Sequence, residues 1–294
     1  MSEHAANPPG VSFLGLSGRL SDPATARYAV LPAPYEGTVS YKTGTAAGPA
    51  AILEASMQVE TFDDELGAEF IDAGVATYPA VEPADNPAEQ MRRVRAAAEP
   101  ILRAGKFLLT LGGEHSITAP LVEAAQAHYG PLGVLHVDAH ADLRDTWEGT
   151  PHSHACVMRR VLERTGRICQ VGIRNVSLEE SRDCPDQVAR FITPAVIASD
   201  RNWVNRALDL LGPAKKVYLT IDIDGLDPSI APGTGTPEPG GLTWPQTLEL
   251  LRAVCTRRTV VAADIVEVRP IPPNHVTEFL AARLAYKIVA YTQL

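Results

Sequence analysis

Short apolar runs alternate along the chain with longer stretches of helical periodicity. The apolar runs cover residues 28–31, 107–111, 133–137, 168–173, 217–223 and 260–265. Several of them are almost continuous in apolar residues, which is typical of strands that are covered on both faces. Helices are predicted for residues 47–58, 88–103, 118–129, 155–164, 203–211, 244–258 and 277–291. This alternation predicts an α/β fold with a mostly parallel sheet and helices on both of its faces.

The chain of 294 residues is expected to form a single domain over residues 1–294. It contains no internal repeat, and no domain boundary is evident after the first ~20 residues, which we expect to form an extended arm. The segment 224–241 is rich in Gly and Pro, but its residues suit tight turns better than a flexible linker.

Composition limits the classes of function. Hydrophobic residues make up 45% of the chain and charged residues 21%, as in soluble globular proteins. The net charge of −9 argues against a nucleic-acid surface and fits a small cationic substrate. No run approaches the ~18 apolar residues of a membrane span, and the first residues do not resemble a signal peptide. The four cysteines lack CxxC spacing, so we expect reduced thiols in a cytoplasmic protein.

Four polar segments stand at or just beyond the ends of predicted strands. Their sequences are LGGEHS at residues 111–116, HVDAHAD at 136–142, TIDIDGLDP at 220–228 and DIVEVRP at 264–270. In an open parallel sheet, ligands bind at the edge where the strands end. We therefore expect these four segments to meet at one site, although they are far apart in the sequence.

The second of these segments indicates a metal centre. Asp138, His140 and Asp142 alternate, so in an extended stretch their side chains point to the same side. Asp222 and Asp224 have the same spacing. Several aspartates cannot readily stay ionised together, because like charges raise one another's pKa, and a bound cation removes this problem.

The candidate metal ligands are His115, Asp138, His140, Asp142, Asp222 and Asp224. Two imidazoles and four carboxylates suffice for two divalent ions, and this mixture suits Mn, Fe, Ni or Zn. No cysteine belongs to the set, which argues against a structural zinc site.

Some neighbouring residues have a structural explanation. Asp227 lies in a DPxxAP stretch and is expected to stabilise the loop. His136 alternates away from the ligand side, which favours a core or supporting position. Glu114 is ambiguous, and we favour a supporting role for it over metal binding.

At these residues the sequence resembles the ureohydrolase family, that of arginase and agmatinase. The resemblance runs from about Pro32 to Tyr291 and includes, in order, PYEGTVSYKTGTAAGPAAILEAS, LGGEHS, DAHAD, SHACVMRR, IDIDGLDPSIAPGTGTPEPGGLT and DIVEVRP. It implies a three-layer α/β/α sandwich with a central, mostly parallel sheet of about eight strands. It also implies two Mn²⁺ ions per chain and assembly as a homotrimer or homohexamer.

The resemblance further implies a role for each candidate residue. One manganese would be bound by His115, Asp138, Asp142 and Asp222, and the other by Asp138, His140, Asp222 and Asp224. Asp138 and Asp222 would then bridge the two ions. His154 matches the catalytic histidine of the family, and Glu267 matches the carboxylate that pairs with the substrate guanidinium. Their structural alternatives are a surface loop histidine and an ion-pair partner of Arg269, respectively.

We therefore expect hydrolysis of a guanidino compound to urea and an amine by a hydroxide bridging two Mn ions. The loop at residues 143–153 has no Asn with which to bind the α-amino-acid end of arginine, and it contains Trp147. Trp147 could pack against a methylene chain or fill an interface. Glu238 adds negative charge nearby, so agmatine is the expected substrate, with putrescine and urea as products.

Other functions remain open at this point. An arginase or a guanidinobutyrase-type amidinohydrolase is the closest alternative, and a non-catalytic metal-binding relative is a more remote one. A metallophosphoesterase also builds a two-metal site from Asp and His, but the GHxH-type pair typical of that class is absent from this sequence.

Overall fold

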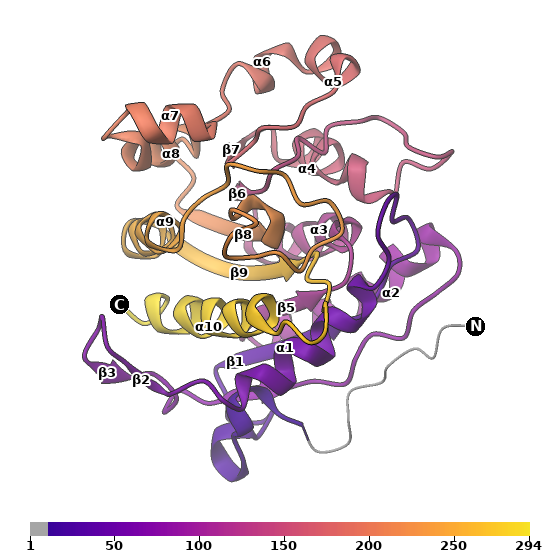
Figure 1. Cartoon of the computed structure of the whole chain (residues 1–294). Helices are drawn as coiled ribbons and strands as arrows, with labels where there is room; N and C mark the ends of the chain where they lie inside the picture. The colour runs from indigo at the N-terminus through magenta and orange to yellow at the C-terminus, as the bar shows by residue number, and fades with distance from the viewer. Residues whose placement is uncertain (1–10) are drawn as a thin grey trace.

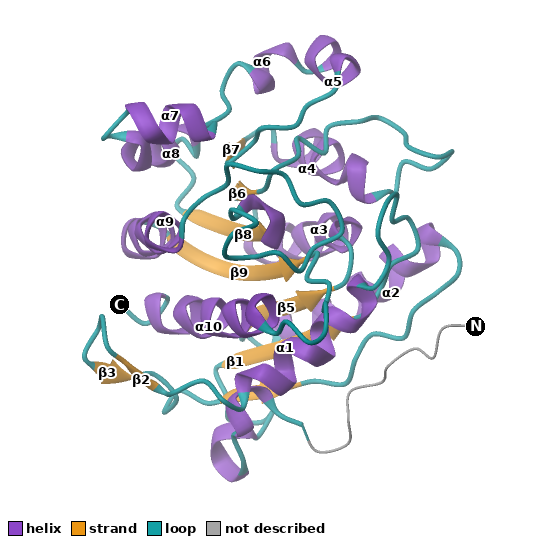
Figure 2. Cartoon of the chain, in the orientation of Figure 1, coloured by secondary structure: helices purple, strands orange, loops and turns teal. Residues whose placement is uncertain are grey.

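The computed structural model describes residues 11–294, and its centre is a seven-stranded parallel sheet (Figures 1 and 2). The strand order is β4-β1-β5-β9-β8-β6-β7, and each neighbouring pair is parallel. The strands are β1 (Tyr28–Ala33), β4 (Val75–Thr77), β5 (Phe107–Gly112), β6 (Gly133–Val137), β7 (Ile168–Val171), β8 (Lys216–Asp222) and β9 (Thr259–Val266). The expected sheet of about eight strands thus has seven.

Helices cover both faces of this sheet, as the apolar strands predicted (Figure 2). One core contains side chains of α1 (Gly48–Ser56), α8 (Trp203–Leu210), α9 (Trp244–Arg257) and α10 (Val276–Tyr291). The other contains side chains of α2 (Pro87–Arg103), α3 (Thr118–Tyr129) and α4 (Val157–Thr165). The strands contribute to both cores by alternation: Tyr28 and Val30 of β1 enter the first core, and Ala29 and Leu31 enter the second. The three-layer α/β/α arrangement is confirmed.

The elements missed by the sequence pattern are short. They include the edge strand β4, the antiparallel hairpin of β2 (Phe62–Asp63) and β3 (Ala68–Glu69), and the helices α5 (Leu178–Asp183), α6 (Pro185–Val188) and α7 (Pro194–Ser199). Elements of this length show too few periods for a hydrophobic pattern to emerge. The expected strand over residues 168–173 ends at Val171, because Gly172 adopts a φ of +94°.

Part of the expected N-terminal arm, residues 1–10, lies outside the described residues. Residues 13–21 contain two short 3₁₀ helices, Phe13–Gly15 and Gly18–Ser21, and Phe13 is buried in the core. Within residues 11–294, no helix is long and apolar enough to cross a membrane.

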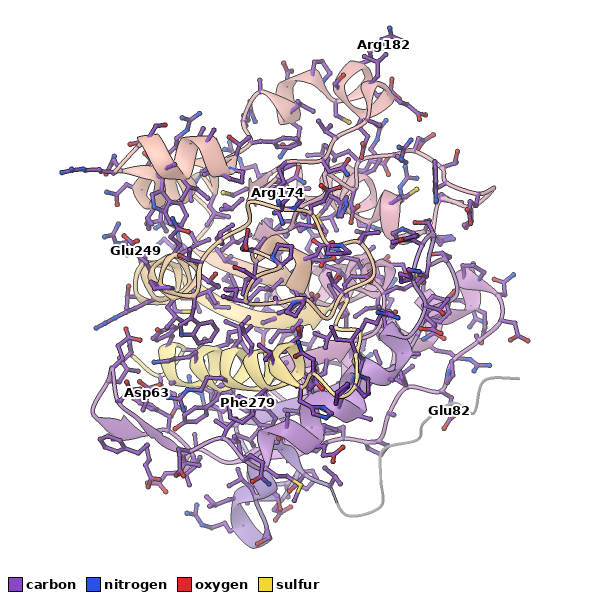
Figure 3. The ribbon with its side chains drawn as sticks, viewed as in Figure 1. Asp63, Glu82, Arg174, Arg182, Glu249 and Phe279 are labelled. Atoms are coloured by element: carbon purple, nitrogen blue, oxygen red, sulfur yellow. The ribbon has the colours of Figure 1, made fainter. Side chains whose placement is uncertain are left out.

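The β2–β3 hairpin projects beside the C-terminal part of α10, and Asp63 is labelled there in Figure 3. Lys287 of α10 is buried, and its Nζ lies 2.8 Å from both Asp63 Oδ1 and Glu65 Oε2. The Tyr291 hydroxyl donates a hydrogen bond of 2.6 Å to the same Glu65 oxygen. Because a buried ammonium needs a charged partner, this network ties the hairpin to the last helix.

Candidate active site

Four adjacent strands, β5, β9, β8 and β6, end beside one cavity of about 220 Å³. The four polar segments of the sequence follow or close these strands, so they converge as expected. The cavity is lined by seven of the eight candidate residues: His115, His140, Asp142, His154, Asp222, Asp224 and Glu267. The eighth, Asp138, is fully buried and contacts the two histidine ligand candidates.

A first group of ligand candidates surrounds His115. Its Nδ1 atom lies 3.1 Å from Asp138 Oδ2, 3.2 Å from Asp142 Oδ2 and 3.3 Å from Asp222 Oδ2. This nitrogen is buried and has no hydrogen-bond partner among the described residues. Buried polar atoms are rarely left unpartnered, and three carboxylate oxygens converge on this one. One imidazole nitrogen and three carboxylates form a suitable ligand set for a divalent cation.

The other ring nitrogen of His115 is held by a hydrogen-bond chain. Thr220 Oγ1 donates a bond of 2.6 Å to Asp264 Oδ1, and it lies 2.9 Å from His115 Nε2. A hydroxyl has one proton, so Thr220 accepts from His115 and the imidazole proton is on Nε2. In the neutral imidazole Nδ1 then carries the lone pair and can bind a cation. Holding the other ring nitrogen in this way is the usual role of residues behind a metal-binding histidine.

A second group shares Asp138 with the first. His140 Nδ1 lies 3.1 Å from Asp224 Oδ2 and 3.5 Å from Asp138 Oδ1. One oxygen of Asp138 thus faces His115 and the other faces His140. This arrangement suits a carboxylate that bridges two cations.

The charges of this cluster favour bound cations. Burial and the neighbouring Asp224 and Asp138 raise the pKa of Asp222 well above its usual value. Burial and Asp138 likewise raise the pKa of Asp142 to about 7. Asp222 and Asp142 would therefore resist ionisation without nearby positive charge, and divalent cations would offset both the burial and the mutual repulsion.

His136 supports the cluster and does not face the cavity. Gln170 Nε2 donates to the carbonyl of Ala141 and lies 3.0 Å from His136 Nδ1, so that nitrogen accepts. His136 Nε2 therefore carries the proton and donates a 2.7 Å hydrogen bond to Asp138 Oδ2. This contact orients the shared carboxylate, which agrees with the supporting position expected for His136.

Glu267 lies at the end of β9 in a left-handed conformation, with φ of +62°. Its N–H donates to the carbonyl of Gly113, and its Oε1 accepts from the His115 N–H at 2.7 Å. A non-glycine residue with positive φ carries strain of ~1–3 kcal/mol, and such strain is typical of functional sites. The alternative pairing with Arg269 is not seen among the described residues, since Arg269 Nε donates instead to the carbonyl of Thr43.

His154 opens a short 3₁₀ helix and lines the same cavity. Burial, together with the nearby His115 and His140, lowers the pKa of His154 to about 4. The imidazole of His154 is thus neutral at pH 7. It is a cavity residue and not a loop histidine on the outer surface.

Several lining residues were not anticipated from the sequence. Residues 39–42 line the cavity, and so does Asn175. Thr236, in the GTGTP stretch, donates a 3.2 Å hydrogen bond to Asp224 Oδ2. The sequence predicts a series of turns for the Gly- and Pro-rich loop. The segment after β1 belongs to the family resemblance, but no role is expected there for residues 39–42, and nothing in the sequence indicates Asn175.

The Gly- and Pro-rich loop is held in place by Arg174, which is labelled in Figure 3. Its guanidinium donates to the backbone carbonyls of Asp224 at 2.7 Å, Glu238 at 2.6 Å and Pro239 at 3.0 Å. Because Asp224 is one of the ligand candidates, Arg174 links the geometry of this loop to that of the candidate metal site.

Trp147 also lines the cavity. Of the two positions expected for it, beside a substrate chain or in an interface, this is compatible with the first. The guanidinium of Arg144 lies 4.4 Å from its ring centroid, which is a cation–π geometry. Arg144 also pairs with Glu179 at 3.1 Å. One face of the indole is therefore occupied by Arg144.

The arginase family model matches residues 26–290 of the chain. The chain is 40% identical to an N(1)-aminopropylagmatine ureohydrolase of Synechocystis over 275 residues, which are 91% of this chain and 90% of that protein. It is 34% identical to a mitochondrial agmatinase of Gallus gallus, with 98% of this chain and 87% of that protein covered.

Solved structures agree with these sequence similarities. The agmatine ureohydrolase of Thermoplasma volcanium superposes with a TM-score of 0.85 and 31% identity, over 94% of this chain and 92% of that one. Relatives of these kinds are hydrolases that act on C–N bonds of linear amidines. The chain therefore belongs to the arginase family, and within it to the agmatinase-like ureohydrolases.

Proposed function

We propose that this chain hydrolyses the guanidino group of a linear amine to urea and the free amine, with two Mn²⁺ ions bound per chain. The observation that carries the proposal is the pair of ligand groups joined by Asp138, which adjoin the cavity that also holds Glu267. The substrate proposed to bind in this cavity is a small cationic guanidino compound.

Each ion would be held by ligands already described. His115, Asp138, Asp142 and Asp222 would bind one, and His140, Asp138, Asp222 and Asp224 the other. The sharing of Asp138 is proposed from its contacts with both histidines, and that of Asp222 from the family resemblance. Two such ions supply a hydroxide nucleophile near neutral pH. Imidazole and carboxylate ligands suit Mn²⁺, and its affinity at such sites is lower than that of Zn²⁺.

Glu267 orients the substrate. Its Oε1 is already bonded to the His115 N–H, so Oε2 is the oxygen that accepts from the substrate guanidinium. Burial and the nearby Glu114 raise the pKa of the Glu267 carboxyl well above its usual value. The positive charge of a bound guanidinium would favour the ionised form of this carboxyl. Collapse of the tetrahedral carbon breaks the C–N bond to the alkyl chain, and the departing nitrogen needs a proton. Neutral His154 would take up on Nε2 the proton that the added hydroxyl loses as the C=O of urea forms, and would deliver it to the departing nitrogen.

The rim of the cavity favours an amine tail without a carboxylate. Asn175 lines the cavity, and its Nδ2 donates a 2.6 Å hydrogen bond to Glu238 Oε1. Glu238 therefore contributes negative charge beside the opening, where the ammonium of agmatine would lie. Arg144 and Lys42 also line the cavity. Arg144 pairs with Glu179 at 3.1 Å, and the Lys42 ammonium lies over the Tyr41 ring. Agmatine, which yields putrescine, is the substrate expected from the sequence.

N(1)-aminopropylagmatine is a second candidate, and it would yield spermidine. It is favoured by the 40% identity to the Synechocystis relative named for that activity. Its longer tail carries two cationic nitrogens and would extend past the rim near Glu238.

The test is kcat/KM for urea release from agmatine, N(1)-aminopropylagmatine, arginine and 4-guanidinobutyrate at equal Mn loading. The kcat/KM of an amine-tailed substrate should exceed that of arginine by at least ~100-fold, which is about 2.7 kcal/mol of transition-state discrimination. A preference for arginine or guanidinobutyrate would contradict the proposed charge at the rim. Whichever of agmatine and N(1)-aminopropylagmatine has the higher kcat/KM is the preferred substrate.

A further inference from the structure

A buried carboxylate outside the ligand set lies behind His154. Glu114 is fully buried and immediately precedes the ligand candidate His115. Its Oε2 accepts a 2.7 Å hydrogen bond from the Thr38 N–H, and its Oε1 accepts from the hydroxyls of Thr38 and Ser116, each at 2.6 Å. Three donors thus converge on a side chain that does not line the cavity.

The fold brings Thr38 to this carboxylate through a close backbone approach. Thr38 lies in the loop after β1, and Glu114 follows β5, the neighbouring strand. The Glu114 N–H donates to the carbonyl of Tyr35 at 2.7 Å. A Cβ on Gly113 would lie 2.0 Å from that carbonyl oxygen, so glycine is required for the loop to pack here.

Thr38 connects Glu114 to His154. Thr38 Oγ1 accepts from the His154 backbone N–H at 3.1 Å and lies 3.3 Å from His154 Nδ1. Because the single hydroxyl proton of Thr38 is donated to Glu114, the hydroxyl can only accept from the imidazole. The Ser153 hydroxyl lies 3.3 Å from the same nitrogen and can also accept from it, so the two hydroxyls favour the tautomer of neutral His154 with its proton on Nδ1 and the lone pair on Nε2.

The chain of contacts matters for the proposed proton transfer. A histidine that carries a proton to a leaving amine must present one ring nitrogen in a fixed orientation, and the bond made by the other nitrogen sets that orientation. Nε2 of His154 lies 3.4 Å from Ser40 Oγ, and Ser40 lines the cavity, so Nε2 is on the cavity side.

We infer that Glu114 and Thr38 are positioning residues, which act through His154 by fixing its tautomer and aiming Nε2 at the departing nitrogen. The inference rests on the proposed function. It assigns a role to the Glu that precedes the metal-binding histidine and to a threonine in the loop after β1.

The test is a double-mutant cycle on kcat with His154→Asn. Thr38→Val removes the hydroxyl and keeps the shape, and Thr38→Ser keeps the hydroxyl. Thr38→Val is expected to lower kcat by ~10- to 100-fold, as small misplacements at a site do, with KM little changed. Thr38→Ser should restore most of that loss. In the His154→Asn background, Thr38→Val should have almost no further effect, because its route of action is already gone.

The cycle is repeated with Glu114→Gln, and each variant is measured for metal content and melting temperature. Thr45→Val is the matched control, since Thr45 is buried in the same N-terminal region and its hydroxyl has no hydrogen-bond partner among the described residues. It should leave kcat unchanged.

Two results would overturn the inference. One is full additivity of Thr38→Val and His154→Asn, which would indicate a structural effect independent of the imidazole. The other is a fall in kcat that parallels loss of metal or of the folded state. Absence of urea release by the wild-type protein from every guanidine would instead refute the proposed function, and the inference with it.

Discussion

The backbone N–H of His115 donates a 2.7 Å hydrogen bond to Oε1 of Glu267, across the ends of neighbouring strands β5 and β9. His115 belongs to the proposed metal-ligand set, and Glu267 is the proposed guanidinium contact. The bond occupies one carboxylate oxygen and leaves the second for the substrate. It also links the position of the carboxylate proposed to bind the substrate to that of the ligand candidate His115, because the bond joins the two segments directly.

Glu267→Gln tests this division of the carboxylate. The amide oxygen can still accept from His115, so the turn should be preserved, but the charge that pairs with guanidinium is lost. A charged hydrogen bond in a closed site is worth ~1.5–3 kcal/mol, so kcat/KM should fall ~10- to 100-fold or more. Metal content, measured by elemental analysis, should stay at the wild-type value. Unchanged kcat/KM would show that Glu267 does not contact the substrate.

Asp138→Ala should abolish binding of two ions per chain, because each oxygen of Asp138 faces a different ligand group. Asp222→Ala should do the same if that carboxylate also bridges. Asp186→Ala, at an exposed position, serves as the control and should keep the full metal content. Two tightly bound ions in the Asp138 variant would rule out the bridging assignment.

His154→Asn should lower kcat by roughly 10²–10⁴-fold, the usual range for general acid–base catalysis. Metal content should not change, because the described contacts of His154 are with Thr38, Ser40 and Ser153. Elemental analysis and steady-state kinetics on the same preparation separate the two roles. A variant that loses an ion would identify His154 as a ligand.

Ionised Glu65 should stabilise the fold, and the free energy of unfolding should therefore fall in acid as Glu65 becomes protonated. Burial raises its pKa, but hydrogen bonds from Lys287, Tyr291 and Arg252 outweigh this effect, and the pKa is lowered from 4.5. A carboxyl with a depressed folded pKa stabilises the fold above its unfolded pKa, and this contribution is lost as pH falls through the folded value.

Glu65→Gln should therefore destabilise the protein by about 1 kcal/mol at neutral pH, the size expected for a partly exposed ion pair. The difference from wild type should shrink as the pH falls through the unfolded pKa of about 4.5 and below it, towards the lowered folded pKa. Chemical denaturation of both proteins across this range gives the difference directly, since the metal ligands are common to both. A difference that is constant with pH would show that Glu65 is not ionised in the fold.

The extent to which the sequence predicted this molecule depended on element length. Strands such as Gly133–Val137 and helices such as Thr118–Tyr129 were located from their apolar pattern to the residue. The edge strand Val75–Thr77 and the short helices between β7 and β8 were missed, because they bury few side chains and show no full period.

The site was predictable where its residues lie on strand ends. Alternation in DAHAD and DID placed the carboxylates on one side, and the structure brings them together. The Thr38–Glu114 contact spans 76 residues and depends on the packing of two loops, so no local pattern could indicate it. Assembly as a trimer or hexamer, and a cytoplasmic location, stay predictions.

Guanidine hydrolysis by this chain is proposed to require two bound cations. The most direct test is urea release from agmatine and N(1)-aminopropylagmatine by protein that has been stripped with a chelator, dialysed and then titrated with Mn²⁺. The account predicts no urea from the stripped protein and activity that rises until two ions are bound per chain. Urea release that survives complete removal of metal, or that is already maximal with one ion per chain, would contradict it.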